Sequence, residues 1–196
     1  MQPDKNWCKQ FTDSELVKKS LENIDNFSCL FERYEPKLLR YIQRISAFSR
    51  EEAEEVLQEA FIKVWENLNE FDDSFKFSSW IYRIVHNTTI SAWKKSRSFG
   101  KDQLIGAVED DFWHNLPSDF NLPCELNKKL DKEKINQILQ KMSPKSREIL
   151  ILKFLEEKNY QEISDILKKP TGTVATLINR AKKEFRALAL DLNIKF

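Results

Sequence analysis

The chain has 196 residues, of which 41% are hydrophobic and 32% charged, while only 3 are glycine and 6 are proline. This length fits one or two small domains, and the scarcity of glycine and proline favours an all-helical fold. No apolar run is long enough to cross a membrane, and the polar N-terminus lacks a signal-peptide core. We therefore expect a cytoplasmic protein with no membrane partner.

The three cysteines, Cys8, Cys29 and Cys124, lie far apart. Such an odd, scattered set indicates neither a disulfide framework nor a zinc site, and it fits a reducing compartment. His86 and His114 have no partner at metal-ligand spacing. The sequence holds no glycine-rich phosphate loop and no defensible arrangement of catalytic carboxylates or nucleophiles. We expect no metal, no cofactor and no catalytic residue, and hence no enzyme.

The net charge of +1 hides strong segregation. Residues 27–75 carry 6 basic and 11 acidic side chains, whereas residues 76–101 carry 6 basic and no acidic ones. Residues 102–127 carry 6 acidic and no basic ones, and residues 128–196 carry 16 basic and 9 acidic ones. This pattern indicates nucleic-acid surfaces in two places and a different partner elsewhere.

Two capping boxes mark helix starts in the N-terminal part. The first, Thr12–Glu15, opens a short helix through Leu21. Between the boxes, apolar side chains at three/four spacing predict a helix over residues 27–46, in which Pro36 predicts a kink or a break. The second box, Ser49–Glu52, opens the helix EEAEEVLQEAFIKVWENL.

This last helix has two different faces. One face is an apolar core stripe made of Ala53, Val56, Leu57, Ala60, Phe61, Val64 and Leu68. The opposite face carries Glu55, Gln58, Glu59, Ile62 and Glu66. An exposed Ile62 and a mobile Trp65 beside the acids would form a docking surface for a basic partner. The alternative is a solvated acidic face.

The stretch from residue 71 to residue 101 interleaves cations with aromatic rings. Its cations are Lys76, Arg83, Lys94, Lys95, Arg97 and Lys101, and its rings are Phe71, Phe75, Phe77, Trp80, Tyr82, Trp93 and Phe99. Cations meet phosphates and rings stack on unpaired bases, so the pattern suits a single nucleic-acid strand. The alternative is a core helix with a solvated basic face.

Within this stretch we predict a polar loop and then a helix. The loop covers residues 69–76, and Ser78 or Ser79 caps a helix from Trp80 to about Ser96. The face predicted to pack on the earlier helices holds Ile81, Ile84, Val85 and Thr88. The face open to a ligand holds Arg83, His86, Asn87, Ile90 and Lys94.

Residues 98–127 break the helical periodicity with glycines, prolines and acids, which predicts an irregular acidic linker. Beyond it, the Ser143-Pro144 pair starts a helix REILILKFLEEK. A helix from Tyr160, a turn over 169–172 with a glycine, and a helix from about Thr173 to Leu190 match a helix-turn-helix. The alternative is an ordinary helical hairpin. The cations after the turn favour DNA binding: Arg180, Lys182, Lys183 and Arg186.

The motifs ERYEPKLLRYIQRI, EEVLQEAFIKVWENL and FSSWIYRIVHN resemble, in order, region 2 of bacterial RNA polymerase sigma factors of the extracytoplasmic-function (ECF) group. The segment SPKSREILILKFLEEKNYQEISDIL and the following KKPTGTVATLINRAKKEFRAL resemble region 4. The resemblance covers nearly all of residues 12–190. It implies an all-α fold of two small domains, residues 1–97 and 128–196, joined by the linker 98–127.

The resemblance also implies function and partners. The chain would be a dissociable sigma subunit that binds core RNA polymerase through its β′ clamp and β subunits and directs it to promoters. Region 2 would melt and hold the minus-ten element, and region 4 would contact the minus-thirty-five element of promoter DNA. An anti-sigma factor, or another protein that recruits region 4, would be a further partner.

Three sets of site residues follow from the resemblance. The polymerase-binding set is Glu55, Gln58, Glu59, Ile62 and Trp65. The minus-ten set is Phe71, Phe75, Lys76, Phe77, Arg83, Asn87 and Lys94, in which the loop 71–76 cups a flipped-out base and Asn87 reads a base. The minus-thirty-five set is Thr171, Thr173, Thr176, Asn179, Arg180 and Lys183.

The sequence departs from the family at two places. Ala175 and Leu177 stand where Arg or Lys is common, so upstream reading would be weak, altered or assisted by another protein. Asp72 and Asp73 replace a common Arg-Gly pair in the loop, so its base preference does not carry over. Two other classes are weighed against a sigma factor: a stand-alone helix-turn-helix regulator with an N-terminal effector domain, and a nucleic-acid enzyme with clustered carboxylates.

Overall fold

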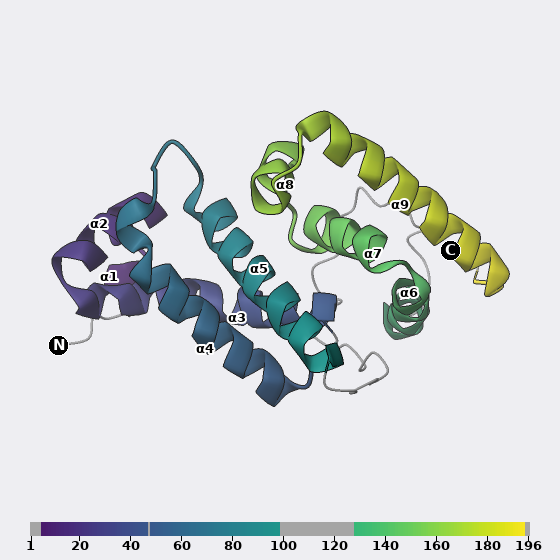
Figure 1. Ribbon diagram of the computed structural model, residues 1–196, viewed down its shortest axis with the longest axis horizontal. Helices are drawn as coiled ribbons and strands as arrows, with labels where there is room; N and C mark the ends of the chain where they lie inside the picture. The colour runs from purple at the N-terminus through teal and green to yellow at the C-terminus, as the bar shows by residue number, and fades with distance from the viewer. Residues whose placement is uncertain (1–4, 47, 99–127, 195–196) are drawn as a thin grey trace. The chain divides into compact units, whose positions relative to one another are not determined.

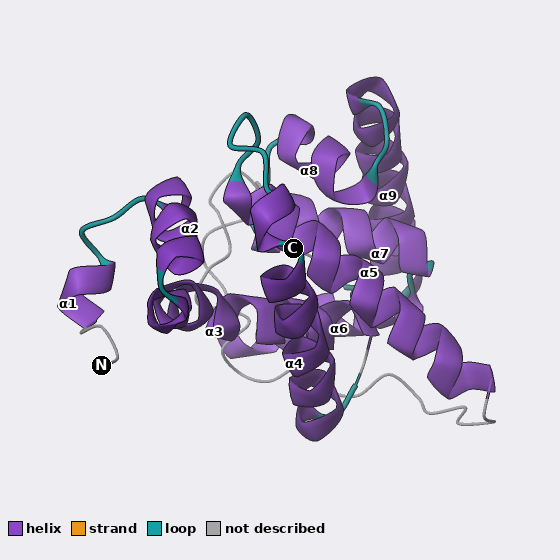
Figure 2. Cartoon of the chain, turned by 60° about the vertical axis from the view of Figure 1, so that its left-hand side comes forward, coloured by secondary structure: helices purple, strands orange, loops and turns teal. Residues whose placement is uncertain are grey.

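A computed structural model describes residues 5–46, 48–98 and 128–194 of the chain. Within these ranges every regular element is a helix or a helical turn (Figures 1 and 2). The contacts divide the chain into two compact units, Met1–Asp102 and Gln103–Phe196. Among the described helices, none is long and apolar enough to span a membrane. The predicted linker lies outside the described residues except for Ser98, which ends a helix.

The first unit is a bundle built around three long helices. Its helices are α1 (Lys5–Cys8), α2 (Asp13–Glu22), α3 (Phe27–Ser46), α4 (Arg50–Glu66) and α5 (Phe77–Ser98). Short 3-10 turns cover Ile24–Asn26 and Leu68–Glu70. Helices α3, α4 and α5 pack against one another, and α2 lies against α3. Figure 1 shows α4 running alongside α5 in this unit.

Both predicted capping boxes are present. The Thr12 backbone N–H donates to Glu15 (2.7 Å), and the Glu15 N–H donates to the Thr12 hydroxyl (3.3 Å). In the second box, the Ser49 N–H donates to the Glu52 carboxylate (3.0 Å), and the Glu52 N–H donates to the Ser49 hydroxyl (3.2 Å). Each cap satisfies backbone donors that have no partner inside the helix, a contribution of about 1 kcal/mol.

The core of the first unit follows the predicted apolar stripes. All six predicted core positions within α4 are buried, and Leu68 just beyond it is buried as well. Tyr41 of α3 and Tyr82 of α5 are both fully buried, with ring centroids 5.1 Å apart. The Tyr41 hydroxyl is 3.1 Å from His86 Nδ1, so His86 turns toward the bundle rather than toward a ligand.

Two local predictions in this unit are corrected. Helix α3 runs without interruption through Pro36, which lies on the exposed side while buried Tyr34 and Leu38 hold the inner side in the core. Helix α5 begins at Phe77 and not at Trp80, because the buried Phe77 ring anchors an earlier start. Ser79 lies buried inside the helix and is not its cap.

The expectation that the cysteines form no disulfide is wrong. Cys8 and Cys29 are joined by a disulfide, with their Cα atoms 5.3 Å apart. The chain turns back after α2, so the end of α1 meets the start of α3. Spacing along the sequence could not show this, because the pair is created by the way the chain folds back.

The second unit contains α6 (Lys128–Lys141), α7 (Pro144–Leu150), α8 (Tyr160–Leu167) and α9 (Thr171–Asp191), with a π turn at Ile151–Leu155 after α7. Helix α9 packs against the other three. The buried side chains that join them include Ile138, Ile149, Ile151, Ile163, Val174 and Ile178. Pro144 is at the first position of α7 as predicted, but the Ser143 side chain accepts no hydrogen bond from the first turn of α7. The Ser143 N–H donates to Glu184 of α9 instead (2.7 Å), as does the Ser143 hydroxyl (3.2 Å).

The turn between α8 and α9 differs from its prediction. Lys168 ends α8 in the left-handed conformation, with φ of 52°. Helix α9 starts at Thr171, so Gly172 lies within its first turn, and a Cβ added there would meet nothing within 4 Å. The sharp bend of this helix-turn-helix is therefore made by a lysine, at a cost of roughly 1–2 kcal/mol.

Candidate nucleic-acid interface

The outer face of α4 is acidic with an apolar centre. Glu55, Gln58 and Glu59 are exposed, and the Ile62 side chain among them is 58% exposed. Glu59 pairs with Lys63 one turn later (2.6 Å), an exposed pair worth little by itself. Ile62 is thus the apolar member of an otherwise acidic and polar exposed face.

Trp65 packs against the start of α3. It is half-buried, and its ring centroid lies 5.3 Å from that of Phe27 at the start of α3. Phe61 continues the cluster, 6.2 Å from Phe27 and 4.5 Å from Phe31. Edge-on and tilted ring contacts thus join α4 to α3 beside the outer face.

The loop before α5 is an ordered turn with carboxylates at its tip. The Asp72 side chain accepts from the Ser74 N–H (2.9 Å), and this hydrogen bond lowers the pKa of Asp72, so it is ionised at neutral pH. Asp73 lies 3.3 Å from Lys18 of α2, which ties the loop to the N-terminal helices. Phe75 is 52% exposed beside them.

The rings near this loop divide into accessible and core groups. Phe77 is buried against Tyr34 (5.5 Å between centroids), so it supports the site from within. Phe71 and Trp80 are half-buried and lie 5.5 Å apart, each also in contact with Phe77. Phe75, Phe71 and Trp80 therefore offer ring surface for stacking. Trp80 is absent from the predicted set, although its place one turn before Arg83 signals the same face.

The exposed side of α5 carries the remaining members of the predicted minus-ten set. Asn87 and Lys94 are exposed, Lys76 is exposed just before the helix, and Arg83 is half-buried. Their separation by three, four or seven residues places them along one side, next to Trp80. Helix α5 packs directly on α4, so this basic and aromatic surface and the acidic surface belong to one rigid body.

Five of the six predicted DNA-facing side chains of the second unit share one face of α9, whereas Thr171, in the first turn, lies seven residues before the buried Ile178 and falls on the opposite side. All six members are exposed: Thr171, Thr173, Thr176, Asn179, Arg180 and Lys183. Thr176 donates its hydroxyl proton to the Gly172 carbonyl (3.0 Å), which leaves its oxygen able to accept. Lys182 is half-buried, with its ammonium 5.1 Å from the Phe154 ring, so it belongs to the packing of the unit.

Ala175 and Leu177 are both half-buried. On a helix of 3.6 residues per turn they fall on opposite flanks of the exposed face, between it and the buried face through Val174 and Ile178. The centre of the face is filled by the threonines, Asn179 and the cations. A substitution at either flank would thus change an edge of the contact surface.

The two units define an all-helical, two-part protein with a helix-turn-helix in its second unit. Sigma-70 region 2 matches residues 30–99, and sigma-70 region 4 matches residues 132–185. The ECF RNA polymerase sigma factor SigW of Bacillus subtilis (strain 168) is 31% identical, with 90% of this chain and 98% of SigW covered. The ECF RNA polymerase sigma-E factor of Escherichia coli (strain K12) is 27% identical, with 89% and 93% covered.

Solved structures show the same fold. CnrH in complex with the cytosolic domain of CnrY matches with a TM-score of 0.65 and 20% identity, covering 92% of this chain and 97% of that one. The sigma factor RpoE of Bartonella quintana, in complex with the anti-sigma factor NepR, matches with a TM-score of 0.61 and 20% identity, covering 83% and 96%. The chain belongs to the sigma-70 family, in its ECF group.

As an ECF sigma factor, the chain directs RNA polymerase to promoters. Family membership disfavours the stand-alone regulator, because region 2 occupies the place where an effector domain would have to be. It equally disfavours a nucleic-acid enzyme, since sigma factors are in general DNA-binding initiation factors.

Proposed function

We propose that the chain is a dissociable, cytoplasmic sigma subunit without an active site of its own, and that its two units divide the work. Residues 1–97 would bind core polymerase and hold the melted minus-ten element, and residues 128–196 would contact the minus-thirty-five element. The single observation that carries the proposal is the packing of α4 on α5. A polymerase-docking face and a strand-binding face share one rigid body, so docking fixes where the strand is held.

The outer face of α4 would bind the β′ clamp of the polymerase. Gln58, Glu59 and Ile62 are exposed, and Trp65 is fixed against Phe27, so the surface is organised before binding. Preorganised side chains lose little conformational entropy on association, which favours affinity. The acids would meet a basic partner surface and speed the encounter.

The loop 71–76 and the exposed side of α5 would capture an unpaired strand. A base that leaves the duplex loses stacking worth roughly a few kcal/mol, and a ring that stacks on it offsets that loss. Phe75, Phe71 and Trp80 would supply the rings. Lys76 and Lys94 would meet phosphates, and Asn87 would donate to and accept from a base edge.

A further protein would compete for the docking surfaces. Two similar solved structures hold sigma factors with bound proteins, CnrY in one and the anti-sigma factor NepR in the other. An anti-sigma factor that covers the exposed Ile62 and the acids of α4 would block polymerase binding. The same surface would thus serve the active and the inhibited state.

The experiment that tests the function uses core polymerase, genomic DNA and the full chain. Sequencing of RNA 5′ ends should return start sites that appear only when the chain is present. A variant with Gln58→Ala and Glu59→Arg should lose these starts and its stoichiometric association with core polymerase, while retaining helicity. Glu22→Arg, an exposed charge reversal at the end of α2, is the matched control and should keep both. Starts that persist in the double variant would remove α4 as the docking element.

A further inference from the structure

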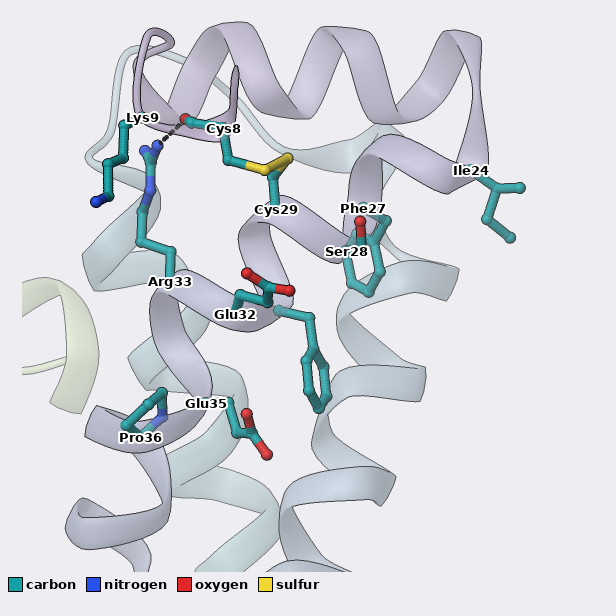
Figure 3. A pocket seen from close by; sticks show the side chains of 11 residues that line it. Cys8, Lys9, Ile24, Phe27, Ser28, Cys29, Glu32, Arg33, Glu35 and Pro36 are labelled. Atoms are coloured by element: carbon teal, nitrogen blue, oxygen red, sulfur yellow. Dashed lines mark hydrogen bonds between the residues drawn. A yellow bond between two sulfur atoms is a disulfide. The ribbon is translucent and has the colours of Figure 1, made fainter. Parts of the chain in front are cut away.

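The first unit holds a groove whose two sides come from different parts of the chain. Its cavity has a volume of about 880 Å³. Cys8 and Lys9 form one side, and all other lining residues come from residues 24–36. Figure 3 shows the Cys8–Cys29 disulfide at the edge of this groove, with Phe27 and Ile24 toward its apolar end. One side of the groove therefore exists only while α1 stays against α3.

Helix α1 has only four residues, and so short a helix is not stable alone in water. Three kinds of contact hold it in place, one of which is the Lys19 ammonium of α2, 5.7 Å from the Trp7 ring centroid. Covalently, Cys8 is bonded to Cys29. Non-covalently, the Arg33 guanidinium donates to the carbonyls of Cys8 (2.7 Å) and Phe11 (3.0 Å), and it pairs with Asp13 (2.6 Å).

We propose that Cys8 and Cys29 form a reversible thiol–disulfide pair that sets how firmly the N-terminal segment is attached to α3. Disulfides in a reducing compartment are usually transient or redox-sensing, and a protein that works with core polymerase is in such a compartment. This proposal depends on the proposed function only for the assignment to a reducing compartment. The positions of Cys8 and Cys29 do not depend on that function.

The reaction balances as thiol–disulfide exchange with a small-molecule disulfide such as oxidised glutathione. The Cys8 thiolate attacks one sulfur of the small disulfide, and the other sulfur leaves as a thiolate and takes up a proton. The Cys29 thiolate then attacks Cys8 in the mixed disulfide and releases the second small thiol. Two protein thiols are oxidised and one small disulfide is reduced to two thiols.

Access favours Cys8 as the first sulfur to react. Cys8 is 8% exposed and Cys29 is 1% exposed, and both line the groove through which a small thiol can approach. Once Cys8 carries the mixed disulfide, Cys29 is already at bonding distance, since the Cα separation of 5.3 Å is in the usual range for a disulfide. The second step is therefore intramolecular and fast.

Reduction would leave Arg33 as the main anchor of the segment. The segment would then open more often, and the side of the groove made by Cys8 and Lys9 would open with it. Lys9 is exposed and follows Cys8 directly, so trypsin cleavage after Lys9 reports this opening. Because cleavage there leaves residues 1–9 bonded through Cys8 to Cys29, the oxidised product keeps its full mass plus one water until it is reduced.

The first experiment uses the full chain with Cys124→Ser, which removes the third thiol. It is equilibrated without oxygen in mixtures of reduced and oxidised glutathione, quenched in acid, alkylated and weighed as an intact protein. In the most reducing mixtures both remaining cysteines should be alkylated. As the share of oxidised glutathione rises, both should together become resistant to alkylation, because they form the disulfide. Cys8→Ser and Cys29→Ser should each keep a single alkylated thiol or a glutathione adduct. Thiols that remain reduced in every mixture, a disulfide that resists the most reducing one, or disulfide-linked dimers would overturn the proposal.

The second experiment measures trypsin cleavage after Lys9 in the oxidised and reduced forms. We expect cleavage about tenfold faster in the reduced form, because a tether that closes the segment onto α3 suppresses local opening. Cys8→Ser should cleave at the reduced rate under both conditions, and it keeps Cys29 in the core if Cys29→Ser fails to fold. Arg33→Ala should speed cleavage more in the reduced than in the oxidised form. Equal rates in the two redox states of the Cys124→Ser chain would refute the tether.

Discussion

Helix α5 of the first unit exposes cations beside aromatic rings, whereas helix α9 of the second unit exposes cations beside hydroxyls and an amide. The ring of α9, Phe185, is buried in the core of its unit. Near α5, Phe75 is 52% exposed and Trp80 is half-buried. Cations are thus common to both surfaces, and rings distinguish them.

The difference follows from what each surface would hold. Bases of an open strand have lost their stacking partners, so a surface that binds them gains by offering rings. Bases of an intact duplex are already stacked, and a helix in the major groove reaches only their edges and the phosphates. The comparison therefore predicts that changes to rings affect opening, and that changes on α9 affect duplex binding.

The largest effect concerns the stability of the second unit. Burial raises the pKa of Glu148 in α7 to about 7, and the positive charge of Lys169 partly opposes this rise. The unfolded chain ionises Glu148 at lower pH than the folded chain does, so the unit loses about 3 kcal/mol of stability as pH rises from about 4.5 to about 7. We expect Glu148→Gln to remove most of this loss at pH above 7 and to change little at low pH.

The measurement is amide hydrogen exchange of α7–α9 in the full chain as a function of pH, after correction for intrinsic exchange. Lys169→Gln is the control, because it should raise the pKa of Glu148 further and so extend the loss of stability to higher pH. A wild-type profile that is flat across neutral pH would contradict the assignment. Glu148→Gln should leave the amide exchange of α3 and α4 unchanged. This would show that the effect is confined to the second unit.

The next effect concerns strand capture by the first unit. Asn87→Ala and Phe75→Ala should each weaken open-complex formation on a duplex promoter by about 1–3 kcal/mol, that is, roughly 5- to 150-fold. Both should weaken it less on a template already mismatched at the minus-ten element, since the base is presented without the cost of opening. Fluorescence of a base analogue in that element follows opening directly. Equal losses on both templates would indicate plain binding in place of capture.

Much of this comparison was predictable from sequence because it depends on periodicity. The core stripe of α4 and the exposed face of α9 follow from 3.6-residue spacing, and the capping boxes at Thr12 and Ser49 follow from short-range chemistry. A face defined by repetition can be read wherever the element is a long helix. The six residues chosen on α9 came from the family resemblance; all six are exposed, and their contacts with DNA stay a prediction.

The side chains whose burial was hard to predict are those that suit both the core and the surface. Phe77 and Phe75 are two residues apart and chemically identical, yet one is 2% exposed and the other is 52% exposed. Trp65 and Trp80 are both half-buried and show the same ambiguity, since a ring suits a core and a binding site equally well. The Cys8–Cys29 disulfide and the left-handed Lys168 depend on how distant segments meet, which local patterns do not encode.

A smaller effect concerns sequence reading by α9. Ala175→Arg places a bidentate donor at the edge of the exposed face, next to Thr176 and Asn179. We expect binding to some duplexes to tighten by about 1–2 kcal/mol relative to others, because an Arg can discriminate guanine. Selection from random duplexes should return a sharper motif for the variant than for the wild type. A wild-type motif that is already sharp would show that the threonines, Asn179 and Arg180 suffice for reading.

The smallest effect separates two adjacent lysines of α9. Lys183 is exposed on the DNA-facing side, whereas the Lys182 ammonium lies 5.1 Å from the Phe154 ring. Lys183→Ala should lower the slope of log affinity against log salt by about one, because one phosphate contact and its released counterion are lost. The loss should be the same for every duplex, since a phosphate contact carries no sequence information. Titration of the full chain with a duplex lacking a minus-ten element gives both quantities.

Lys182→Ala is the matched control. It should leave the slope of log affinity against log salt nearly unchanged. It should instead lower the stability of the second unit, because it removes a cation–ring contact and the packing of its alkyl chain. Identical salt slopes for the two variants would mean that the exposed side of α9 does not face the phosphates.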